Sequence, residues 1–309
     1  MAATCLSIPN PKTPQRRLSL LFCPGMGAKP QITIVGAGSA AGALAVSLHR
    51  AGYAIEQIIA RSGGAPLRRA RSLARNVGSR AVVSSRASIE SEVVWFCVPD
   101  SQIASAARSI ATATNWKAKV AIHSSGALRS DALVALRARG AEVASAHPLM
   151  TFVPGSRPLL AGVPFAIEGD KHAVRAAKRI VKNLRGDPFS VKKKDKAAYH
   201  AWATFASPLL TTLLATAERV ASAAGVQPRA ARRRMLPIVA QTIANYAALG
   251  ASVSFSGPFV RGDAQTIRIH LQALRRVPAA REAYVALARA ALTYLPARNR
   301  KALQKILKG

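Results

Sequence analysis

A glycine-rich turn near the start of the chain constrains the fold more than any other feature of the sequence. Four β-favouring residues, 32–35, lead directly into Gly36-Ala37-Gly38, and an alanine-rich helical stretch follows. In such a strand-turn-helix unit the first glycine permits the tight turn, the second lets the backbone approach a pyrophosphate, and a small third residue, here Ala41, allows close packing. The alternative is a glycine-rich turn that binds no nucleotide. We predict a dinucleotide-binding loop whose phosphate contacts come from Gly36, Gly38, Ser39 and Ala40.

Short apolar segments alternate with helical ones along residues 31–192, which is typical of βαβ units and a parallel sheet. We predict strands at residues 32–35, 55–60, 93–98, 120–123, 142–146, 165–168 and 188–191. Helices are predicted at residues 40–51, 66–76, 101–112, 130–139 and 171–184. After Lys194 no strand signal of comparable strength returns. The fold class is therefore α/β, with an N-terminal Rossmann domain that holds a doubly wound, mostly parallel sheet, followed by an all-α C-terminal domain at residues 193–309.

Residues 1–30 differ from the rest of the chain, with five prolines, no acidic residue and no sustained periodicity. They are predicted to form a disordered tail before the first strand. Their Arg and Ser content resembles a transit peptide, although acidic residues are scarce throughout the chain. Translation that starts at Met26 instead of Met1 would leave only a short lead into the fold.

The charge balance is strongly positive, with 45 Lys and Arg against 13 Asp and Glu and a formal net charge of +32. Such a field favours phosphorylated or carboxylated ligands and makes nucleic acid a candidate partner. The basic residues are scattered, however, and aromatic residues, which stack on bases, make up only 5% of the chain. We predict a solvated, arginine-rich surface and a small anionic substrate, and we do not expect a nucleic-acid partner.

The cysteine and hydrophobic patterns favour a soluble, cytoplasmic protein. Cys5, Cys23 and Cys97 have no metal-ligand spacing, so no metal site is expected, and Cys97 falls in an apolar strand as a buried thiol. Arg, Lys, Gly or Pro interrupts every apolar run before it reaches the roughly 20 residues of a membrane span. We therefore expect no membrane contact.

The end of the second predicted strand indicates which dinucleotide is bound. An NAD enzyme places Asp or Glu there for the ribose hydroxyls, whereas this strand ends in Ala60-Arg61-Ser62. A guanidinium and a hydroxyl suit a 2′-phosphate, which favours NADP over NAD. The alternative is that Arg61 is simply another surface arginine.

The third predicted strand ends at the same edge of the sheet, where open α/β sheets bind their ligands. Val98 and Pro99 are therefore expected to flank the cofactor, and Asp100 or Ser101 is expected to cap the next helix. Ser124, directly after the following strand, is predicted to contact the cofactor as well.

Histidine and serine side chains after two strands are candidates for the chemistry. His147 precedes Pro148, which biases it towards an extended conformation with a fixed side chain. A histidine pKa lies near neutral, so His147 is the first candidate to take or return a substrate proton while hydride moves. Ser125 is predicted to orient a substrate carboxylate or carbonyl. The alternative for His147 is a hydrogen bond that only shapes the domain junction.

A polar stripe crosses the first helix of the C-terminal domain. His200, Thr204, Ser207 and Thr211 follow at steps of four, three and four, within about 40° of one line at 100° per residue. The helix is otherwise apolar, so we expect it to be buried, with its stripe facing a cleft between the domains. His200 is the second candidate acid or base, with a core hydrogen bond as the alternative. Thr204 and Ser207 are candidate substrate contacts.

A later loop supplies the last candidate. Residues 257–263 lead into a helix, and Asp263 is its expected N-cap. Arg261 is predicted to clamp an anionic substrate, unless it is an exposed arginine of a capping loop.

Together these motifs resemble a bacterial family of Rossmann-like proteins that carry a C-terminal helical domain of unknown function. The resemblance covers residues 31–280 and rests on the order of Gly36-Ala37-Gly38, Val98-Pro99-Asp100, His123-Ser124-Ser125-Gly126, His147-Pro148-Leu149, Tyr199-His200-Ala201 and Gly257-Pro258-Phe259-Val260-Arg261-Gly262-Asp263. The wider group contains 6-phosphogluconate dehydrogenase, pyrroline-5-carboxylate reductase and prephenate dehydrogenase. Membership implies a dehydrogenase or reductase whose helical domain often dimerises, so a homodimer is expected.

Similarity to prephenate dehydrogenases implies a role for two residues. Those enzymes place a His-Pro pair about twenty residues after a serine-bearing turn, and the histidine accepts the substrate's hydroxyl proton. His147 and Ser125 match this arrangement. The chain departs from its closer relatives at Ser207-Pro208, where Asn usually follows Ser. If that Asn contacts substrate, Pro208 puts equivalent activity in doubt, and a proline should also kink the helix.

The sequence therefore favours an NADP-dependent oxidoreductase that transfers a hydride between the nicotinamide and a small anionic substrate in the interdomain cleft. The alternatives are a non-catalytic NADP-binding sensor and a basic protein associated with nucleic acid. Neither the substrate nor the direction of hydride transfer follows from the sequence.

Overall fold

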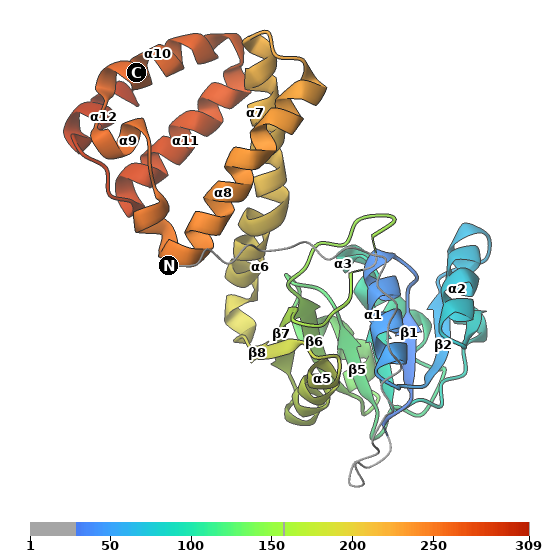
Figure 1. Ribbon diagram of the computed structural model, residues 1–309. Coiled ribbons are helices and arrows are strands. Elements are labelled where there is room, and N and C mark those ends of the chain that lie inside the picture. The colour runs from blue at the N-terminus through green and yellow to red at the C-terminus, as the bar shows by residue number, and fades with distance from the viewer. Residues whose placement is uncertain (1–28, 157, 309) are drawn as a thin grey trace, which may run out of the picture. The chain divides into compact units, whose positions relative to one another are not determined.

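The computed structural model describes residues 29–156 and 158–308, which fall into two compact units that divide between Lys194 and Asp195 (Figure 1). The first unit is built on a sheet and the second on helices. Residues 1–28, nearly all of the predicted disordered tail, lie outside the described residues.

One eight-stranded sheet, ordered β3-β2-β1-β4-β5-β6-β7-β8, forms the centre of the first unit. Neighbouring strands are parallel, except that β6 and β7 pair antiparallel. Because the chain winds outward from β1 in both directions, the predicted doubly wound, mostly parallel sheet is confirmed. The strands are β1 (Ile32–Val35), β2 (Ile55–Ala60), β3 (Arg80–Val83), β4 (Val93–Phe96), β5 (Val120–His123), β6 (Glu142–Pro148), β7 (Pro164–Gly169) and β8 (Asp187–Ser190).

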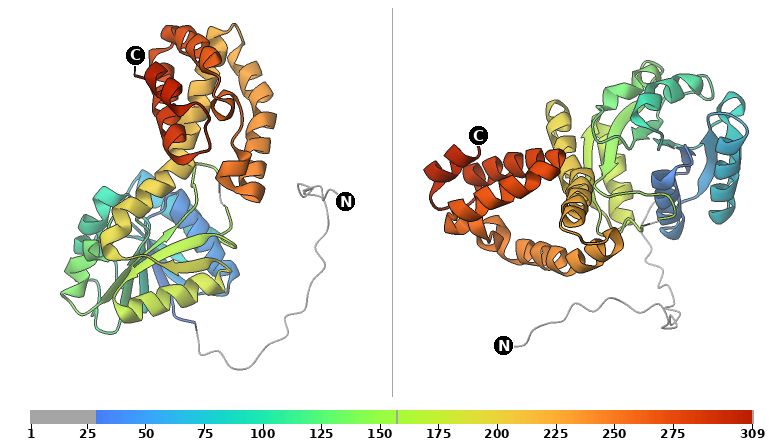
Figure 2. Two further views of the ribbon diagram at one scale, coloured as in Figure 1. Left: turned by 90° about the vertical axis from the view of Figure 1, so that its left-hand side faces the viewer. Right: turned by 90° about the horizontal axis from the view of Figure 1, so that it is seen from above.

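Helices cover both faces of this sheet, as Figure 2 shows. Residues of α1 (Ser39–Arg50), α2 (Ala65–Asn76) and α5 (Lys171–Asn183) pack into one core cluster. Residues of α3 (Asp100–Ser109) and α4 (Val134–Arg137) pack into the other. The alternation of side chains along each strand supplies both clusters at once.

β4 shows this alternation most directly. Val93 and Trp95 belong to the cluster of α1, whereas Val94 and Phe96 belong to the cluster of α3. All four side chains are at most 2% exposed. A strand buried on both faces therefore reads as a continuous apolar run, which made it predictable.

The sequence missed one strand of the first unit and misjudged one helix. β3 was not predicted, because it is a four-residue edge strand that begins with an exposed arginine and is too short for its apolar pattern to stand out. The helix predicted at residues 130–139 is instead a 3-10 turn, Ser130–Leu133, followed by the single turn of α4.

The second unit contains helices and no strand among its described residues, as predicted. A small apolar core joins its last helices through Ile267, Leu271, Ala288, Leu292, Leu303 and Leu307. The elements are α6 (Lys196–Thr204), a π-helical segment (Phe205–Leu209), α7 (Leu210–Ala223), α8 (Pro228–Ser254), α9 (Pro258–Arg261), α10 (Ala264–Ala273), α11 (Pro278–Tyr294) and α12 (Arg300–Ile306).

The prediction that the first helix of this unit is buried was wrong. Trp202 of α6 is 55% exposed and Phe205 is 68% exposed, and α7 contains no buried residue. An apolar face is buried only where the chain provides enough apolar surface to pack against it. In α6 and α7 that partner surface is incomplete.

α8 contains most of the longest uncharged stretch of the unit. No charged residue occurs from residue 235 to residue 260. By length and composition, the segment Pro228–Arg261 is the one helix of the described chain that could cross a membrane, and its most apolar stretch has no buried residue. Pro237 and Gly250 interrupt the segment, as expected of apolar runs in this sequence, and the backbone of Gly250 is not helical.

The carboxylate of Glu56 joins the first three strands at the amino-terminal edge of the sheet. It accepts hydrogen bonds from Thr33 Oγ1 at 3.1 Å, from the Arg80 guanidinium at 3.0 Å and from the backbone N–H of Ser91 at 2.8 Å. Burial alone would raise the pKa of Glu56, but the hydrogen bonds from Ser91, Thr33 and Arg80 outweigh it and hold the pKa below its ordinary value.

Glu56→Gln is expected to destabilise the protein by about 1–3 kcal/mol near pH 7, because an amide nitrogen then faces buried donors. A lowered carboxyl pKa stabilises the folded state above the unfolded pKa, and this stability is lost as pH falls through the folded pKa. The difference between variant and wild type should therefore shrink in acid. Urea denaturation at about pH 7 and about pH 3.5 measures both effects. Glu90→Gln, at an exposed neighbouring position, is the matched control, and equal losses in the two variants would refute the role of Glu56.

Candidate functional site

The glycine turn between β1 and α1 has the geometry that its sequence predicts. Gly36 has φ +111°, and a Cβ on it would lie 2.3 Å from the carbonyl oxygen of Cys97. A Cβ on Gly38 would meet no atom within 4 Å. Ala41 is fully buried. Gly36 is thus required by the protein itself, whereas the space beside Gly38 is open to a ligand.

The first turn of α1 begins directly after this turn. Gly38 is the N-cap residue, and no side chain caps the helix. The N–H groups of Ser39 and Ala40 have no carbonyl four residues earlier within the helix to bond. An anionic group fits at such a helix start, where the helix dipole also favours negative charge.

A hollow of about 260 Å³ lies next to this turn, at the carboxyl ends of β1 and β2. Arg61, which follows β2, and Val98, which follows β4, both line it, and both were predicted cofactor contacts. Ser84 and Gln102 line it as well and were not predicted. Ser84 follows the unpredicted strand β3, so the sequence offered no reason to place it here. Its hydroxyl donates a 3.1 Å hydrogen bond to the carbonyl of Arg61.

Ser124 is held at the end of β5 by the core. Its hydroxyl oxygen accepts a 2.9 Å hydrogen bond from the indole N–H of Trp95 and lies 3.5 Å from the sulfur of Cys97. Burial raises the pKa of the Cys97 thiol to about 12, so this thiol stays protonated at neutral pH. Either the Ser124 hydroxyl or the protonated Cys97 thiol can donate in the contact between them, and when the thiol donates, the Ser124 proton is available to another acceptor.

Ser125 lies inside a hydrogen-bond network and is only 4% exposed. Its hydroxyl donates to Asp100 Oδ2 at 2.8 Å and accepts from the backbone N–H of Leu128 at 2.9 Å. The prediction that Asp100 or Ser101 caps α3 was wrong, because Pro99 is the N-cap residue and no side chain caps the helix. The Asp100 carboxylate instead accepts the Ser125 hydroxyl and ties α3 to the loop after β5.

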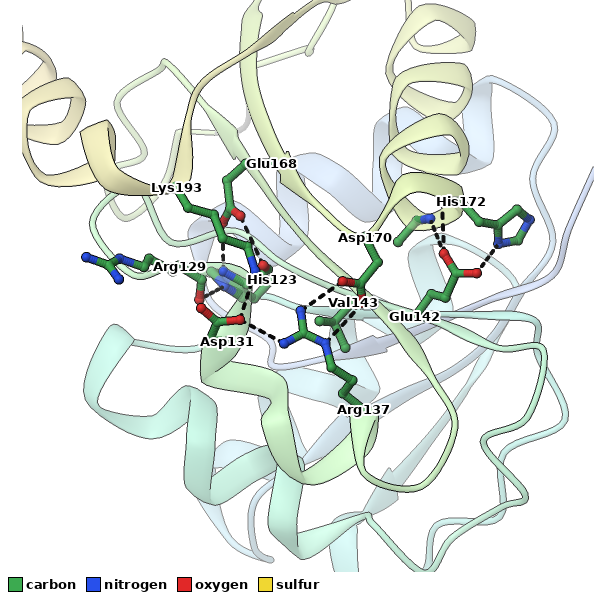
Figure 3. Close-up of polar contacts among 12 residues, drawn as sticks. His123, Arg129, Asp131, Arg137, Glu142, Val143, Glu168, Asp170, His172 and Lys193 are labelled. Carbon is green, nitrogen blue, oxygen red and sulfur yellow. Dashed lines mark hydrogen bonds and ion pairs between the residues drawn. The ribbon is translucent and has the colours of Figure 1, made fainter.

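His123 fixes the other side of that loop. Its side chain is fully buried, and its Nδ1 accepts from the backbone N–H of Ser125 at 3.1 Å. Its Nε2 lies 3.0 Å from the carbonyl oxygen of Arg129. A carbonyl only accepts, so Nε2 carries the proton and the ring is the neutral Nε2–H tautomer. Figure 3 shows this bond among the polar contacts that surround the loop.

Carboxylates of β7 and of the N-cap residue of α5 anchor the far end of the same loop (Figure 3). Buried Glu168 accepts hydrogen bonds from the backbone N–H and the hydroxyl of Ser130, at 2.6 and 3.0 Å. The Arg137 guanidinium bridges Asp131 at 2.8 Å and Asp170 at 3.0 Å. The loop that carries Ser124 and Ser125 is therefore fixed at both ends.

His147 lies near the carboxyl end of β6, opposite Ala166 of β7. Ser145, two residues earlier on the same face of β6, donates a 3.0 Å hydrogen bond to the carbonyl of Ser125. The half-buried His147 is thus on the side of the sheet that carries the Ser125 loop. The structure brings together the predicted strand-end residues around the carboxyl ends of β4, β5 and β6.

The polar stripe of the second unit differs from the prediction. Thr204 and Thr211 donate their hydroxyls to the carbonyls of His200 and Ser207, at 2.9 and 3.2 Å. The π-helical segment Phe205–Leu209 interrupts the α-helix and contains Pro208. A π-helical turn takes more residues than an α-helical turn, so a spacing of four, three and four no longer marks one line.

The loop before α10 confirms one prediction. Asp263 caps the helix, with its carboxylate accepting from the N–H and the hydroxyl of Thr266 at 3.0 and 2.7 Å. Arg261 ends α9 directly before this cap and is exposed.

Comparison with known proteins identifies both parts of the chain. Residues 26–148 match a family described as a Rossmann-like domain, and residues 163–291 match a domain of unknown function, DUF2520. The chain therefore combines a Rossmann-like domain with a DUF2520 domain. No curated protein matches it.

Solved structures share the fold along most of the chain. A protein of Bacteroides fragilis, provisionally assigned as an NADP oxidoreductase, is 22% identical, with a TM-score of 0.71 over 85% of this chain and 97% of its own. Protein TM1727 of Thermotoga maritima is 24% identical, with a TM-score of 0.66 over 90% and 98%. An imine reductase from a Pseudomonas species is 21% identical, with a TM-score of 0.60 over 91% and 100%.

The two glycines of the turn separate folding from ligand binding. Gly36→Ala is expected to destabilise the protein by at least about 2 kcal/mol, because it strains φ and meets the carbonyl of Cys97. Gly38→Ala should keep stability within about 0.5 kcal/mol and weaken dinucleotide binding at least about tenfold. Urea denaturation and a fluorescence titration with NADPH measure the two effects. Unchanged NADPH affinity in Gly38→Ala would remove the turn from the site.

Proposed function

We propose that this chain, a Rossmann-like domain followed by a DUF2520 domain, is an NADP-dependent oxidoreductase. The observation that carries the proposal is the hollow beside the glycine turn, which Arg61 and Ser84 line together. Fold similarity to a provisionally assigned NADP oxidoreductase and to an imine reductase supports it. In this hollow, the guanidinium of Arg61 and the hydroxyl of Ser84 suit the phosphate and hydroxyl groups of a phosphorylated ribose.

The residues that would hold the cofactor come from four strand ends. The N–H groups at the start of α1 fit the pyrophosphate, and Gly38 leaves room for it. Arg61 suits a 2′-phosphate, with the hydroxyl of Ser62 beside it in sequence, and no carboxylate stands at the end of β2 to favour NAD. Val98, Pro99 and Ser124 would flank the nicotinamide end.

The acid or base proposed for the reaction is His147. When bound, NADPH supplies a hydride to the carbon of a C=N or C=O bond. The nitrogen or oxygen of that bond then needs a proton, and the ring of His147 is placed near the carboxyl end of β6 to hold one. In the reverse direction the same ring would accept the proton.

Ser124 and Ser125 have different roles in this proposal. The Ser124 hydroxyl is anchored by Trp95 and has a proton to donate to a substrate or to the nicotinamide amide. Ser125 is bonded to Asp100 and Leu128, so it acts as a positioning residue that fixes the loop. It supports the chemistry through Ser124 and His147.

The substrate is proposed to be small and anionic. The net charge of +32 raises the local concentration of anions around the protein. The second unit would contribute His200, Thr204 and Ser207 to substrate binding, and Arg261 as a partner for a carboxylate. Of these side chains, the hydroxyl of Thr204 is bonded to its own helix, which makes it the weakest candidate.

We also propose that the protein forms a homodimer through its helical unit. Its proposed location is the cytoplasm. In α8, Ile238, Tyr246 and Val253 are 68%, 61% and 70% exposed. Two-fold symmetry brings the same surface of two copies together, so a partner copy can cover this apolar stripe. The break at Gly250 and the polar Gln241, Thr242 and Asn245 in mid-helix favour this partner over a lipid bilayer.

The function is tested by NADPH oxidation with a panel of cyclic imines and 2-keto acids. Arg61→Ala should raise the KM for NADPH about tenfold or more and leave that for NADH unchanged, because a charge-assisted hydrogen bond is lost. His147→Ala should lower kcat about 100-fold or more without changing the Kd for NADPH. His200→Ala tests the second candidate acid or base in the same assay.

Two variants serve as controls in that assay. Arg75→Ala removes an exposed arginine from the last turn of α2, and His172→Ala removes an exposed histidine on α5. Neither should change turnover. Tight NADPH binding with no turnover on any substrate would favour an NADP-binding sensor over an enzyme. Equal NADPH and NADH affinities in the wild type would contradict the assignment of Arg61 to the 2′-phosphate.

The dimer is tested by light scattering, where we expect twice the chain mass of 32.5 kDa in buffer without detergent. The pair Ile238→Glu and Tyr246→Glu places charges on the apolar stripe and should give monomers. Gln265→Glu, on the exposed side of α10, is the control and should leave the dimer intact. A wild-type monomer, or a protein recovered only with membranes, would contradict the proposal.

A further inference from the structure

An open cleft with a charged lining lies on the last three helices of the chain. α10, α11 and α12 pack through the small apolar core that includes Leu271 and Leu303. Their outer side is hollowed by a cleft of about 690 Å³. We call it the basic cleft, and its lining residues are Arg268, Leu271, Gln272, Arg275, Arg281, Ala302, Lys305 and Ile306.

Four cationic side chains converge on the basic cleft from separate elements. Arg268 comes from α10, Arg275 from the 3-10 turn Leu274–Arg276, Arg281 from α11 and Lys305 from α12. No carboxylate side chain is among the lining residues. Like charges gathered around one hollow repel each other, so a bound anion would stabilise this arrangement.

The other arginines of the same region show a different pattern. Residues 264–308 contain ten Lys and Arg and one acidic residue, Glu282. Arg289 donates to the carbonyl of Leu307 at 2.6 Å, and Arg300 donates to that of Leu295 at 2.9 Å, so both close helix ends. The side chains of Arg268, Arg275 and Lys305 make no hydrogen bond or ion pair with any other residue of the described chain. Their charges are thus available to a ligand.

The lining indicates which anion fits. Guanidinium forks match the oxygens of tetrahedral oxyanions in a bidentate manner, and an ammonium adds a point charge. No aromatic side chain lines the cleft, so there is no platform on which a nucleobase could stack. The volume falls within the range of small-molecule sites. Several charges around one cleft favour several linked phosphates over a single one.

We propose that the basic cleft binds a compact polyphosphate, a chain of two or three linked phosphates without a base. The basic cleft is separate from the hollow of the first unit that Arg61 and Val98 line, which we call the cofactor hollow. The inference does not depend on the proposed function. Nucleic acid presents phosphates as well, but it would need an extended basic surface and stacking residues, which the lining does not offer.

Calorimetric titration with inorganic triphosphate tests the site. The wild type should bind with a micromolar Kd that weakens as salt rises from about 50 to about 200 mM. The double variant R275Q/K305Q should bind at least about tenfold more weakly. The double variant R276Q/K301Q loses the same charge from the same two elements, at exposed positions outside the cleft, and should bind as the wild type does. Thermal melts check that both variants fold.

Four outcomes would overturn the proposal. Equal weakening in the two double variants would assign binding to diffuse surface charge. Loss of triphosphate binding in Arg61→Ala would assign it to the cofactor hollow. Displacement of triphosphate by duplex DNA that binds more tightly would make the cleft part of a nucleic-acid surface. Orthophosphate should bind more weakly than triphosphate, and equal affinity would also contradict a site for linked phosphates.

Discussion

The backbone contact between Gly36 and the carbonyl of Cys97 sets the position of everything else at the carboxyl edge of the sheet. A Cβ at Gly36 would come within 2.3 Å of that oxygen, so the turn after β1 can lie against the end of β4 only as glycine. From this turn α1 starts. Next to it, Cys97 and Trp95 hold Ser124, and the Ser124–Ser125 loop continues towards β6. The hollow lined by Arg61 and Val98 and the strand end that carries His147 belong to the same sheet.

Much of the first unit could be predicted from the sequence, because its strands are buried apolar runs between turns. β1, β2 and β5 have the bounds that were predicted. The glycine turn could be predicted as well, because the backbone of the turn requires glycine at that position. β3 was not predicted because an edge strand needs few apolar residues. Ser84 follows β3, so its place in the hollow was not predicted either. The role of Asp100 depends on a loop 25 residues away, which no local pattern encodes.

The second unit was less predictable for a physical reason. An alanine-rich helix with apolar residues on most of its surface fits a buried core, a subunit interface or a lipid environment equally well. The sequence therefore predicted helices correctly, and burial incorrectly, at Trp202 and Phe205. Pro208 was expected to kink a helix, and the chain accommodates it in a π-helical segment instead. The wider π-helical turn changes which residues of α6 and α7 lie on the same helix face.

One consequence of how the site is built concerns the fluorescence of Trp95. Its ring is fully buried, and its indole N–H is bonded to the hydroxyl of Ser124, so its emission depends on the polarity at the edge of the sheet. Trp116 is also buried and donates to the carbonyl of Ala111, whereas Trp202 is 55% exposed and should emit at longer wavelength. The three tryptophans of the chain thus differ in the polarity of their surroundings. A molecule that binds at Ser124 should therefore shift the ultraviolet emission of Trp95, which can be recorded without any label.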